Sequence, residues 1–176
     1  MESDDALMQA LAAGRSEALR LLVDRHGTAV LNFLYRMTGD RAASEDLSQE
    51  VFLRVFRHAS RYVAGGGFRG WLFAIARNLA LNYGRHRRME RRVRAPAPRS
   101  EDPAERAELE RAVEAAIDRI DEPFRSALVL CTVDGLSYDE AAAACGCTVK
   151  TLSSRLARAR MRLRELLSPH LKEDRS

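Results

Sequence analysis

The chain has 176 residues, of which 46% are hydrophobic and 31% are charged. This length suits one domain or two small ones, and the apolar fraction is high enough to bury a core, which excludes collagen-like and low-complexity chains. The 29 basic and 25 acidic residues give a net charge of +4, and all the basic residues except Lys150 and Lys172 are arginine. Because the guanidinium group binds phosphate through a bidentate fork, this bias favours a nucleic-acid partner, although codon composition would explain it as well.

The sequence predicts no targeting segment and no membrane span. Its first residues, 2–5, include neither a basic n-region nor an apolar h-region, and Arg77 interrupts the most apolar run, 71–81. We therefore expect no signal peptide and no membrane insertion. The cysteines are too few and too unevenly spaced for a secreted disulfide framework, so a reducing, cytoplasmic localisation fits best. They are Cys131, Cys145 and Cys147.

Apolar residues recur with a period near 3.6 along most of the sequence, and no segment alternates apolar and polar residues for long. This pattern predicts an all-α fold. Glycines, prolines and capping residues mark where the helices end or begin. In chain order, the predicted helices span about 4–13, 16–38, 41–61, 69–92, 103–120, 124–133, 137–145 and 148–167.

A proline-rich, acidic segment divides the chain. The stretch 93–122 carries 5 basic and 9 acidic residues, and three prolines lie within its first eleven positions, where they disfavour helix. We predict two small helical domains joined by a flexible linker, with bounds of 1–94, 95–110 for the linker, and 111–176. Residues 95–103 should be mobile and the first site of proteolysis, and the two domains should fold separately.

The end of the chain has the layout of a helix-turn-helix unit. A supporting helix at 124–133 precedes a short helix opened by the capping box of Ser137 and Glu140, and Gly146 forms the following turn. Thr148 is then a good N-cap for the last helix. Six apolar residues of that helix form the stripe predicted to face the core: Val149, Leu152, Leu156, Ala159, Leu163 and Leu166.

The opposite face of the last helix is small and basic, and no acidic residue occurs from 148 to 164. Such side chains can enter the major groove of DNA, where arginine and lysine contact guanine edges and serine contacts bases or phosphates. A solvated arginine-rich surface is the alternative, but an acid-free run after a glycine turn favours DNA. The candidate DNA-reading residues are Lys150, Ser153, Ser154, Arg155 and Arg158.

The predicted helix at 41–61 has a densely polar face. Its apolar stripe consists of Leu47, Val51, Phe52 and Val55. The other side carries Asp46, Gln49, Glu50 and Arg54. A partner could bind this face, but a solvated helix surface explains the pattern equally well.

The predicted helix at 69–92 carries an unusual strip of side chains beside its apolar stripe. A tryptophan, two amides and an arginine align there, at Trp71, Asn78, Asn82 and Arg85, and further arginines, including Arg88, follow downstream. Single-stranded nucleic acid is bound by this chemistry, because bases stack on aromatic faces, amides read base edges and arginines hold phosphates. Trp71 could equally well be a core residue, and the pattern alone leaves both interpretations open.

Three segments in this order resemble the extracytoplasmic-function sigma factors, the smallest members of the bacterial primary-type sigma family. Residues 46–52 (DLSQEVF) resemble the region 2 helix that docks on the clamp helices of the RNA polymerase β′ subunit. Residues 68–78 (FRGWLFAIARN) resemble the strand-opening segment that reads the minus-ten element. Residues 135–142 (GLSYDEAA) and 154–160 (SRLARAR) resemble the region 4 helix-turn-helix, which reads the minus-thirty-five element.

The resemblance implies a sigma factor with core RNA polymerase (β′ clamp helices and β flap), promoter DNA and an anti-sigma factor as partners. It assigns polymerase binding to Asp46, Gln49, Glu50 and Arg54. It assigns recognition of the minus-ten element to Phe68, Trp71, Asn78, Asn82, Arg85 and Arg88. It also implies that the loop at 65–70 holds a flipped base of that element. Many members carry aspartate where Asn82 stands, so this chain departs from the family by lacking a carboxylate at that position for the nearby arginines. The five candidate DNA-reading residues of the last helix would contact the minus-thirty-five element.

No catalytic constellation is visible. The four histidines are scattered, and the glycine-rich segment 65–70 lacks the Lys-Ser/Thr of a phosphate loop. Cys145 and Cys147 have only Cys131 as a further cysteine ligand, which leaves the set short of the four ligands of a zinc site. We therefore interpret them as buried apolar thiols. We therefore expect no enzyme activity, no cofactor and no metal. The remaining alternatives are a helix-turn-helix regulator that acts without polymerase and an RNA-binding helical protein.

Overall fold

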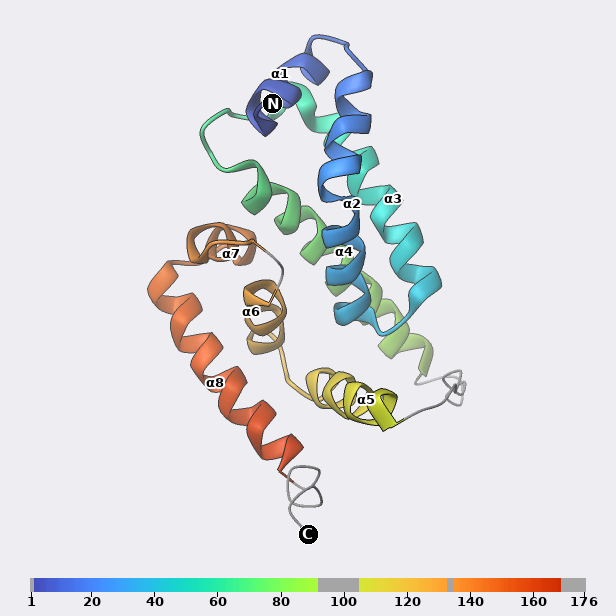
Figure 1. Ribbon diagram of the computed structural model, residues 1–176, viewed down its shortest axis with the longest axis vertical. Helices are drawn as coiled ribbons and strands as arrows, with labels where there is room; N and C mark the ends of the chain where they lie inside the picture. The colour runs from blue at the N-terminus through green and yellow to red at the C-terminus, as the bar shows by residue number, and fades with distance from the viewer. Residues whose placement is uncertain (1, 92–104, 133–134, 169–176) are drawn as a thin grey trace.

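The computed structural model describes residues 2–91, 105–132 and 135–168, except for the side chains of 88–91 and 105–110. These described residues form eight α-helices and one short 3-10 helix, and they contain no strand (Figure 1). The all-α fold predicted from the sequence is confirmed. No helix in the described ranges is long and apolar enough to cross a membrane.

The helices form two units that follow one another along the chain. The first unit contains α1 (Asp4–Ala12), α2 (Glu17–Thr38), α3 (Arg41–His58), the 3-10 helix η1 (Ala59–Arg61) and α4 (Phe68–Arg91). The second unit contains α5 (Glu105–Asp118), α6 (Phe124–Cys131), α7 (Tyr138–Cys145) and α8 (Val149–Leu167). The predicted linker segment 95–103 lies outside the described residues, and the predicted domain bounds and independent folding stay predictions.

Local sequence signals account for several helix ends. The side chains of Ser3, Asp40 and Thr148 each accept a hydrogen bond from a backbone N–H in the first turn of the helix that follows. Ser137 and Glu140 form the predicted capping box at the start of α7. Gly146 ends α7 with φ of 61°, a left-handed conformation that glycine adopts without steric cost.

Two predictions need correction, one about the extent of α3 and one about the buried stripe of α8. The helix predicted at 41–61 is α-helical only to His58, and its last turn tightens into a 3-10 helix before Tyr62 leaves the helix in an extended conformation. Val149 was predicted to face the core, but it is 36% exposed. Helical side chains lean toward the N-terminus, so the first residue of α8 points past the end of the stripe that begins at Leu152.

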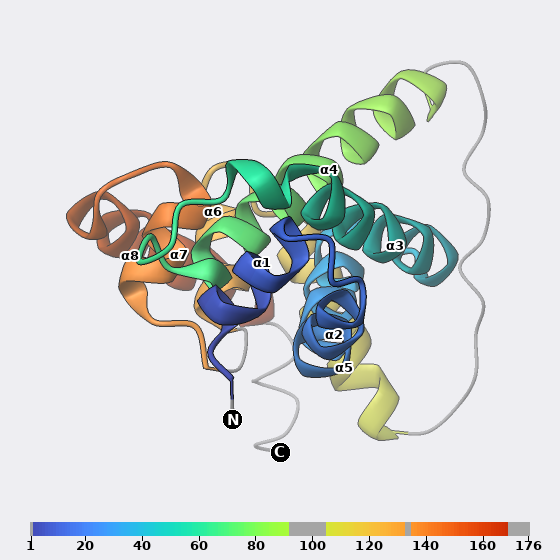
Figure 2. The same cartoon turned by 90° about the horizontal axis from the view of Figure 1, so that it is seen from above.

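The two units pack against each other through α4 and α7, as the two views in Figures 1 and 2 show. One cluster of buried side chains includes Leu72 and Phe73 of α4 together with Ala141 and Ala144 of α7. At this contact, a Cβ atom added to Gly70 would lie 3.0 Å from the Cβ of Ala143. Glycine therefore allows the two helices to approach at backbone distance.

Arginines of the first unit bind groups of the second around this contact. Arg36 donates to the hydroxyl of Thr132 at 3.1 Å, and Arg69 donates to the carbonyl of Gly135. Arg77 of α4 lies 4.0 Å from the carboxylate of Glu122, just before α6. The residues that resemble the strand-opening segment thus also hold the second unit in place.

We expect a Gly70→Leu substitution to separate α4 from α7, because the added side chain would occupy the position of Ala143. The radius of gyration measured by small-angle X-ray scattering should rise, and the melting temperature should fall. Gly84→Leu is the matched control on the same helix, since a Cβ there meets nothing within 4 Å. Equal scattering curves for the two variants and the parent would show that Gly70 does not control the contact.

Candidate functional site

The last helix, α8, has one buried stripe and one solvent-facing side. Leu152, Leu156 and Ala159 are buried against the other helices of the second unit. Five residues were predicted to read DNA: Lys150, Ser153, Ser154 and Arg158 are exposed, and Arg155 is half-buried. The structure therefore presents this set on one accessible helix that follows a capped α7 and a glycine turn. This is the geometry of a recognition helix.

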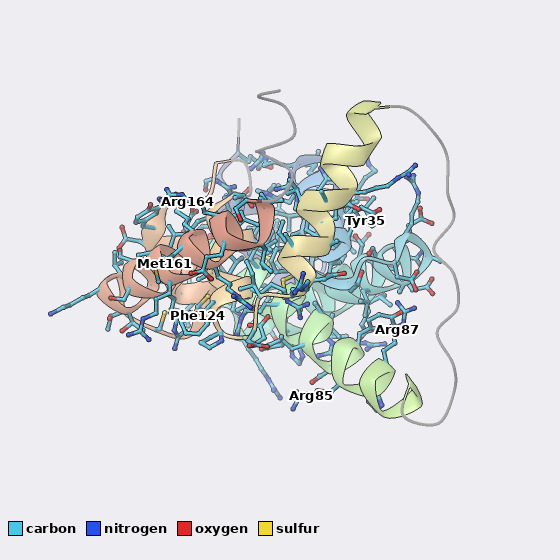
Figure 3. The ribbon with its side chains drawn as sticks, turned by 90° about the horizontal axis from the view of Figure 1, so that it is seen from below. Tyr35, Arg85, Arg87, Phe124, Met161 and Arg164 are labelled. Carbon is cyan, nitrogen blue, oxygen red and sulfur yellow. The ribbon has the colours of Figure 1, made fainter. Side chains whose placement is uncertain are left out.

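Two of these side chains already have partners within the chain. The hydroxyl of Ser154 donates to the carbonyl of Lys150, one turn earlier in α8, at 3.1 Å. The guanidinium carbon of Arg158 lies 6.0 Å from the ring centre of Phe124, which Figure 3 shows beside α8. The aromatic ring orients the arginine without removing its charge, so Arg158 keeps its donors for an anionic or guanine partner.

The candidate strip on α4 is only partly accessible. Asn78, Asn82 and Arg85 are exposed, and Arg85 donates a hydrogen bond to the side-chain oxygen of Asn82. Asn82 is therefore bound to an arginine one turn later on the same helix. Arg87 lies on the opposite side of α4 from Arg85 (Figure 3), where it donates to Asp40 at 3.2 Å. The side chain of Arg88 lies outside the described part of the structure.

Trp71 and Phe68 belong to an aromatic cluster at the start of α4. The ring centres of Tyr62 and Trp71 lie 5.3 Å apart, and those of Phe68 and Trp71 lie 6.1 Å apart. Trp71 is half-buried, so part of its ring is open to solvent. Phe68 is only 4% exposed, and its assignment to minus-ten DNA stays a prediction. In this structure its ring supports Trp71 from within the core.

The loop before α4 is exposed and rich in glycine. Gly65 and Gly67 have φ values of 84° and 80°, in the left-handed region that other residues rarely adopt. Val63 at the start of this loop is 76% exposed, and a Cβ added to Gly65 or Gly67 would meet no atom within 4 Å. The backbone at Gly65 and Gly67 is therefore open to solvent, close in the chain to Trp71.

The polar face of α3 contains the residues predicted to bind polymerase. Asp46 and Gln49 are exposed, while Glu50 and Arg54 are half-buried. Arg54 donates to the carboxylate of Glu50 at 2.7 Å, and this hydrogen bond lowers the pKa of that carboxyl. Glu50 is thus charged and already paired within its helix, whereas Asp46 and Gln49 offer accessible polar groups.

An apolar groove of about 750 Å³ lies between α2 and α3, beside this polar face. Its walls include Leu19, Val23, Phe52 and Leu53, and Gln49 lies at its edge. Leu53 is 47% exposed, and the neighbouring Phe56 is 50% exposed. Exposed large apolar side chains next to a groove mark interaction surfaces.

The sequence predictions missed this groove, although α3 carries a signal for it. Leu53 lies opposite the buried stripe of α3, and Phe56, three residues later, lies at the border between that stripe and the polar side. Apolar residues that interrupt a polar helix face are typical of a surface that binds a partner. The sequence shows these two apolar residues, but the groove exists only because α2 packs beside α3.

The three cysteine thiols lie in the second unit, at the end of α6, at the end of α7 and in the turn that follows α7. Cys145 is buried, Cys131 and Cys147 are half-buried, and all three are free. Burial raises the pKa of Cys145 to about 11 and also raises the pKa of Cys131. At neutral pH these two groups are therefore protonated thiols, poor as nucleophiles and as metal ligands. No group of three or more His, Cys, Asp or Glu residues in the described ranges is placed to hold a metal ion.

A helical unit with an accessible tryptophan and amides, followed by a helix-turn-helix unit, defines a two-module DNA-binding protein. Comparison with family models supports this class. Residues 22–90 match the model of sigma-70 region 2, and residues 110–163 match that of sigma-70 region 4. The two matches fall on the first and the second helical unit, respectively.

Similar proteins extend these matches over most of the chain. The chain is 40% identical over 161 residues to the ECF RNA polymerase sigma factor SigE of Mycolicibacterium smegmatis, covering 86% of this chain and 62% of that longer protein. It is 31% identical over 194 residues to the RNA polymerase sigma-H factor of Pseudomonas aeruginosa, covering 98% of this chain and 97% of the relative. The chain belongs to the family of ECF RNA polymerase sigma factors.

Solved structures agree with this family. The structure of CnrH in complex with the cytosolic domain of CnrY matches with a TM-score of 0.77 and 28% identity, covering 96% of this chain and 99% of that one. The sigma factor RpoE in complex with the anti-sigma factor NepR from Bartonella quintana matches with a TM-score of 0.71 and 28% identity. That match covers 85% of this chain and 96% of RpoE.

Proposed function

We propose that this protein is a promoter-specificity subunit that binds core RNA polymerase, directs it to particular promoters and assists promoter opening. The observation that carries this proposal is the order of the matches, with sigma-70 region 2 on α2–α4 and sigma-70 region 4 on α5–α8. A regulator that acts without polymerase would not need the region 2 unit. The chemistry of RNA synthesis belongs to the polymerase, so this chain acts as a regulatory subunit in the cytoplasm.

Each candidate surface has a role in this function. The groove between α2 and α3, with Asp46 and Gln49 at its polar side, is the surface proposed to dock on the β′ clamp helices. The strip of Trp71, Asn78 and Asn82 on α4 is proposed to hold the opened minus-ten strand. The exposed face of α8 is proposed to read the minus-thirty-five duplex, and the second unit also to contact the β flap.

An anti-sigma factor is the partner that controls such a protein. RpoE, which shares this fold, was crystallised with its anti-sigma factor NepR. In the present structure α7 packs on α4, and Arg69 and Arg77 of the strand-opening segment are engaged with the second unit. We propose that an anti-sigma domain binds this closed arrangement and keeps both DNA-reading helices away from a promoter.

The direct test is transcription with purified core polymerase on a library of promoters with randomised minus-thirty-five and minus-ten elements. A sigma factor selects a defined pair of elements, and selection requires core enzyme. Selection without core enzyme would favour the autonomous regulator. Binding to structured RNA, with no transcription at all, would favour the RNA-binding protein.

Replacing Ser154 and Arg158 by alanine should change the preferred minus-thirty-five sequence. Each good base contact contributes about 1–3 kcal/mol of discrimination, so the preference at the contacted base pairs should relax by roughly 5-fold to 150-fold. The measurement is the selection profile from the promoter library. Arg164→Ala is the control, since it removes the same charge near the other end of α8 (Figure 3). An unchanged profile in the double variant would exclude this face of α8 as the reader.

A further inference from the structure

The first helix of the chain lies outside the region 2 match, which begins at residue 22. Its first turn nevertheless contacts the segment that leads into the candidate minus-ten strip. Two consecutive carboxylates, Asp4 and Asp5, begin α1, and both are half-buried. Because neighbouring residues on a helix point about 100° apart, the two carboxylates reach different partners.

Asp4 links α1 to α2 through polar contacts. Its carboxylate pairs with Arg25 and lies 3.0 Å from Nε2 of His26. The ring of His26 is only 6% exposed and lies 5.3 Å from the ring centre of Phe68. Asp4 therefore fixes the start of α1 against the same aromatic cluster that supports Trp71.

Asp5 binds the loop before α4 with both of its carboxylate oxygens. One oxygen accepts a hydrogen bond from the hydroxyl of Tyr62, and the other accepts from the backbone N–H of Gly65 at 2.9 Å. Burial and the bond to Asp5 both raise the pKa of Tyr62, so its hydroxyl remains a donor at neutral pH. The two contacts span the segment between η1 and the glycines.

Among the hydrogen bonds of the described residues, the one from Gly65 to Asp5 is the only one that ties the segment 63–67 to a distant part of the chain. Gly65 and Gly67 adopt left-handed backbone conformations with no atom near their Cβ positions. The other backbone hydrogen bonds described for the loop are local, from Gly66 to Val63 and from Trp71 to Gly67. A charge-assisted hydrogen bond from a fixed helix therefore decides where Gly65 lies.

We propose that Asp5 is a positioning residue for minus-ten recognition: it holds the loop at 62–67 and the ring of Trp71 in the arrangement that receives an unpaired promoter base. This inference rests on the proposed function, because that function assigns Trp71, which follows this loop, to the opened minus-ten strand. Tyr62 transmits the effect, since Asp5 orients its hydroxyl while its ring lies 5.3 Å from that of Trp71. Asp5 itself contacts no DNA.

The first test uses fluorescence and does not involve polymerase. Trp71 is the single tryptophan of the chain, so its emission reports directly on the cluster. Asp5→Ala should shift the emission to the red and increase quenching by acrylamide, because Tyr62 and the loop lose their anchor. Asp5→Asn should recover only part of the parent signal, since its single side-chain oxygen can accept one of the two hydrogen bonds and carries no charge. Glu17→Gln removes the same charge from an exposed site on α2 and should change nothing.

The second test measures base preference in the minus-ten element by selection from the randomised promoter library. Asp5→Ala should flatten the preference at one position by about tenfold, the effect of losing roughly one hydrogen bond, while affinity for core enzyme stays at the parent value. A pre-melted template should not restore this preference, because the loop that reads the base is misplaced. Tyr62→Phe, which keeps the ring and removes only the donor, should weaken the same position to a smaller extent.

The outcomes separate this inference from the proposed function. A uniform loss of transcription at all positions, in parallel with a lower melting temperature, would mean that Asp5 only stabilises the fold and would overturn the proposal. If Asp5→Ala fails to fold, Tyr62→Phe decides, and an unaltered minus-ten profile in that variant overturns the proposal too. If the parent protein itself shows no core-dependent selection, the proposed function fails, whatever the fluorescence shows.

Discussion

Trp71→Ala should retain binding to core polymerase and formation of the closed promoter complex, and it should lose most promoter opening. Opened DNA exposes the face of a base that the duplex hides, and the half-buried Trp71 can stack on it only after the strands part. Base–aromatic stacking contributes about 1–3 kcal/mol per base, which matches the few kcal/mol needed to unpair and unstack one base. Losing this contact should lower opening by roughly 5-fold to 150-fold.

The measurement is permanganate reactivity of promoter thymines, beside a core-binding assay and a melting curve. Pre-melted templates should partly rescue Trp71→Ala, because the unpairing cost is already met. Asn78→Ala should affect mainly one base, since an amide reads a base edge whereas a ring stacks on any base. The melting curve is essential because Trp71 also packs against Tyr62, so its loss could lower opening by destabilising the fold. A folded Trp71→Ala variant that opens duplex promoters like the parent would make Trp71 a core residue only.

A second large effect is expected in the groove between α2 and α3. Leu53→Glu and Phe56→Glu should each weaken binding to core polymerase by about 30-fold or more, because apolar side chains central to an interface contribute about 2 kcal/mol or more. Both side chains are about half exposed in the free protein, so polar replacements should leave its melting temperature nearly unchanged. Asp46→Arg combined with Glu50→Lys should weaken binding through charge reversal on the neighbouring polar face.

The affinity for core enzyme is measured by titration of labelled variants. Leu21→Glu is the matched control, since Leu21 is a 40% exposed apolar residue of α2 that does not line the groove. It should bind core enzyme like the parent. Parent-like affinity in Leu53→Glu, Phe56→Glu and the charge-reversal variant would show that core polymerase docks elsewhere on the protein.

The sequence by itself determined the local features of this protein. Helix positions follow from apolar periodicity, and helix ends follow from residues such as Asp40, Ser137, Gly146 and Thr148, whose effects act within one turn of the chain. The exposed face of α8 was predicted for the same reason, because one face of a helix is fixed once the other is buried. The family resemblance also rests on such short segments read in order.

Only the tertiary structure decided which surfaces meet. The contact of Gly70 with α7, the burial of Phe68 and the groove at Leu53 each depend on helices far apart in the sequence. A helical period shows that a residue lies on a given face but not which element covers that face. The link from Asp5 to Gly65 spans 60 residues and uses a backbone N–H, a group that every non-proline residue carries. No pattern of side chains can reveal such a partner, because the chain path alone brings the two groups together.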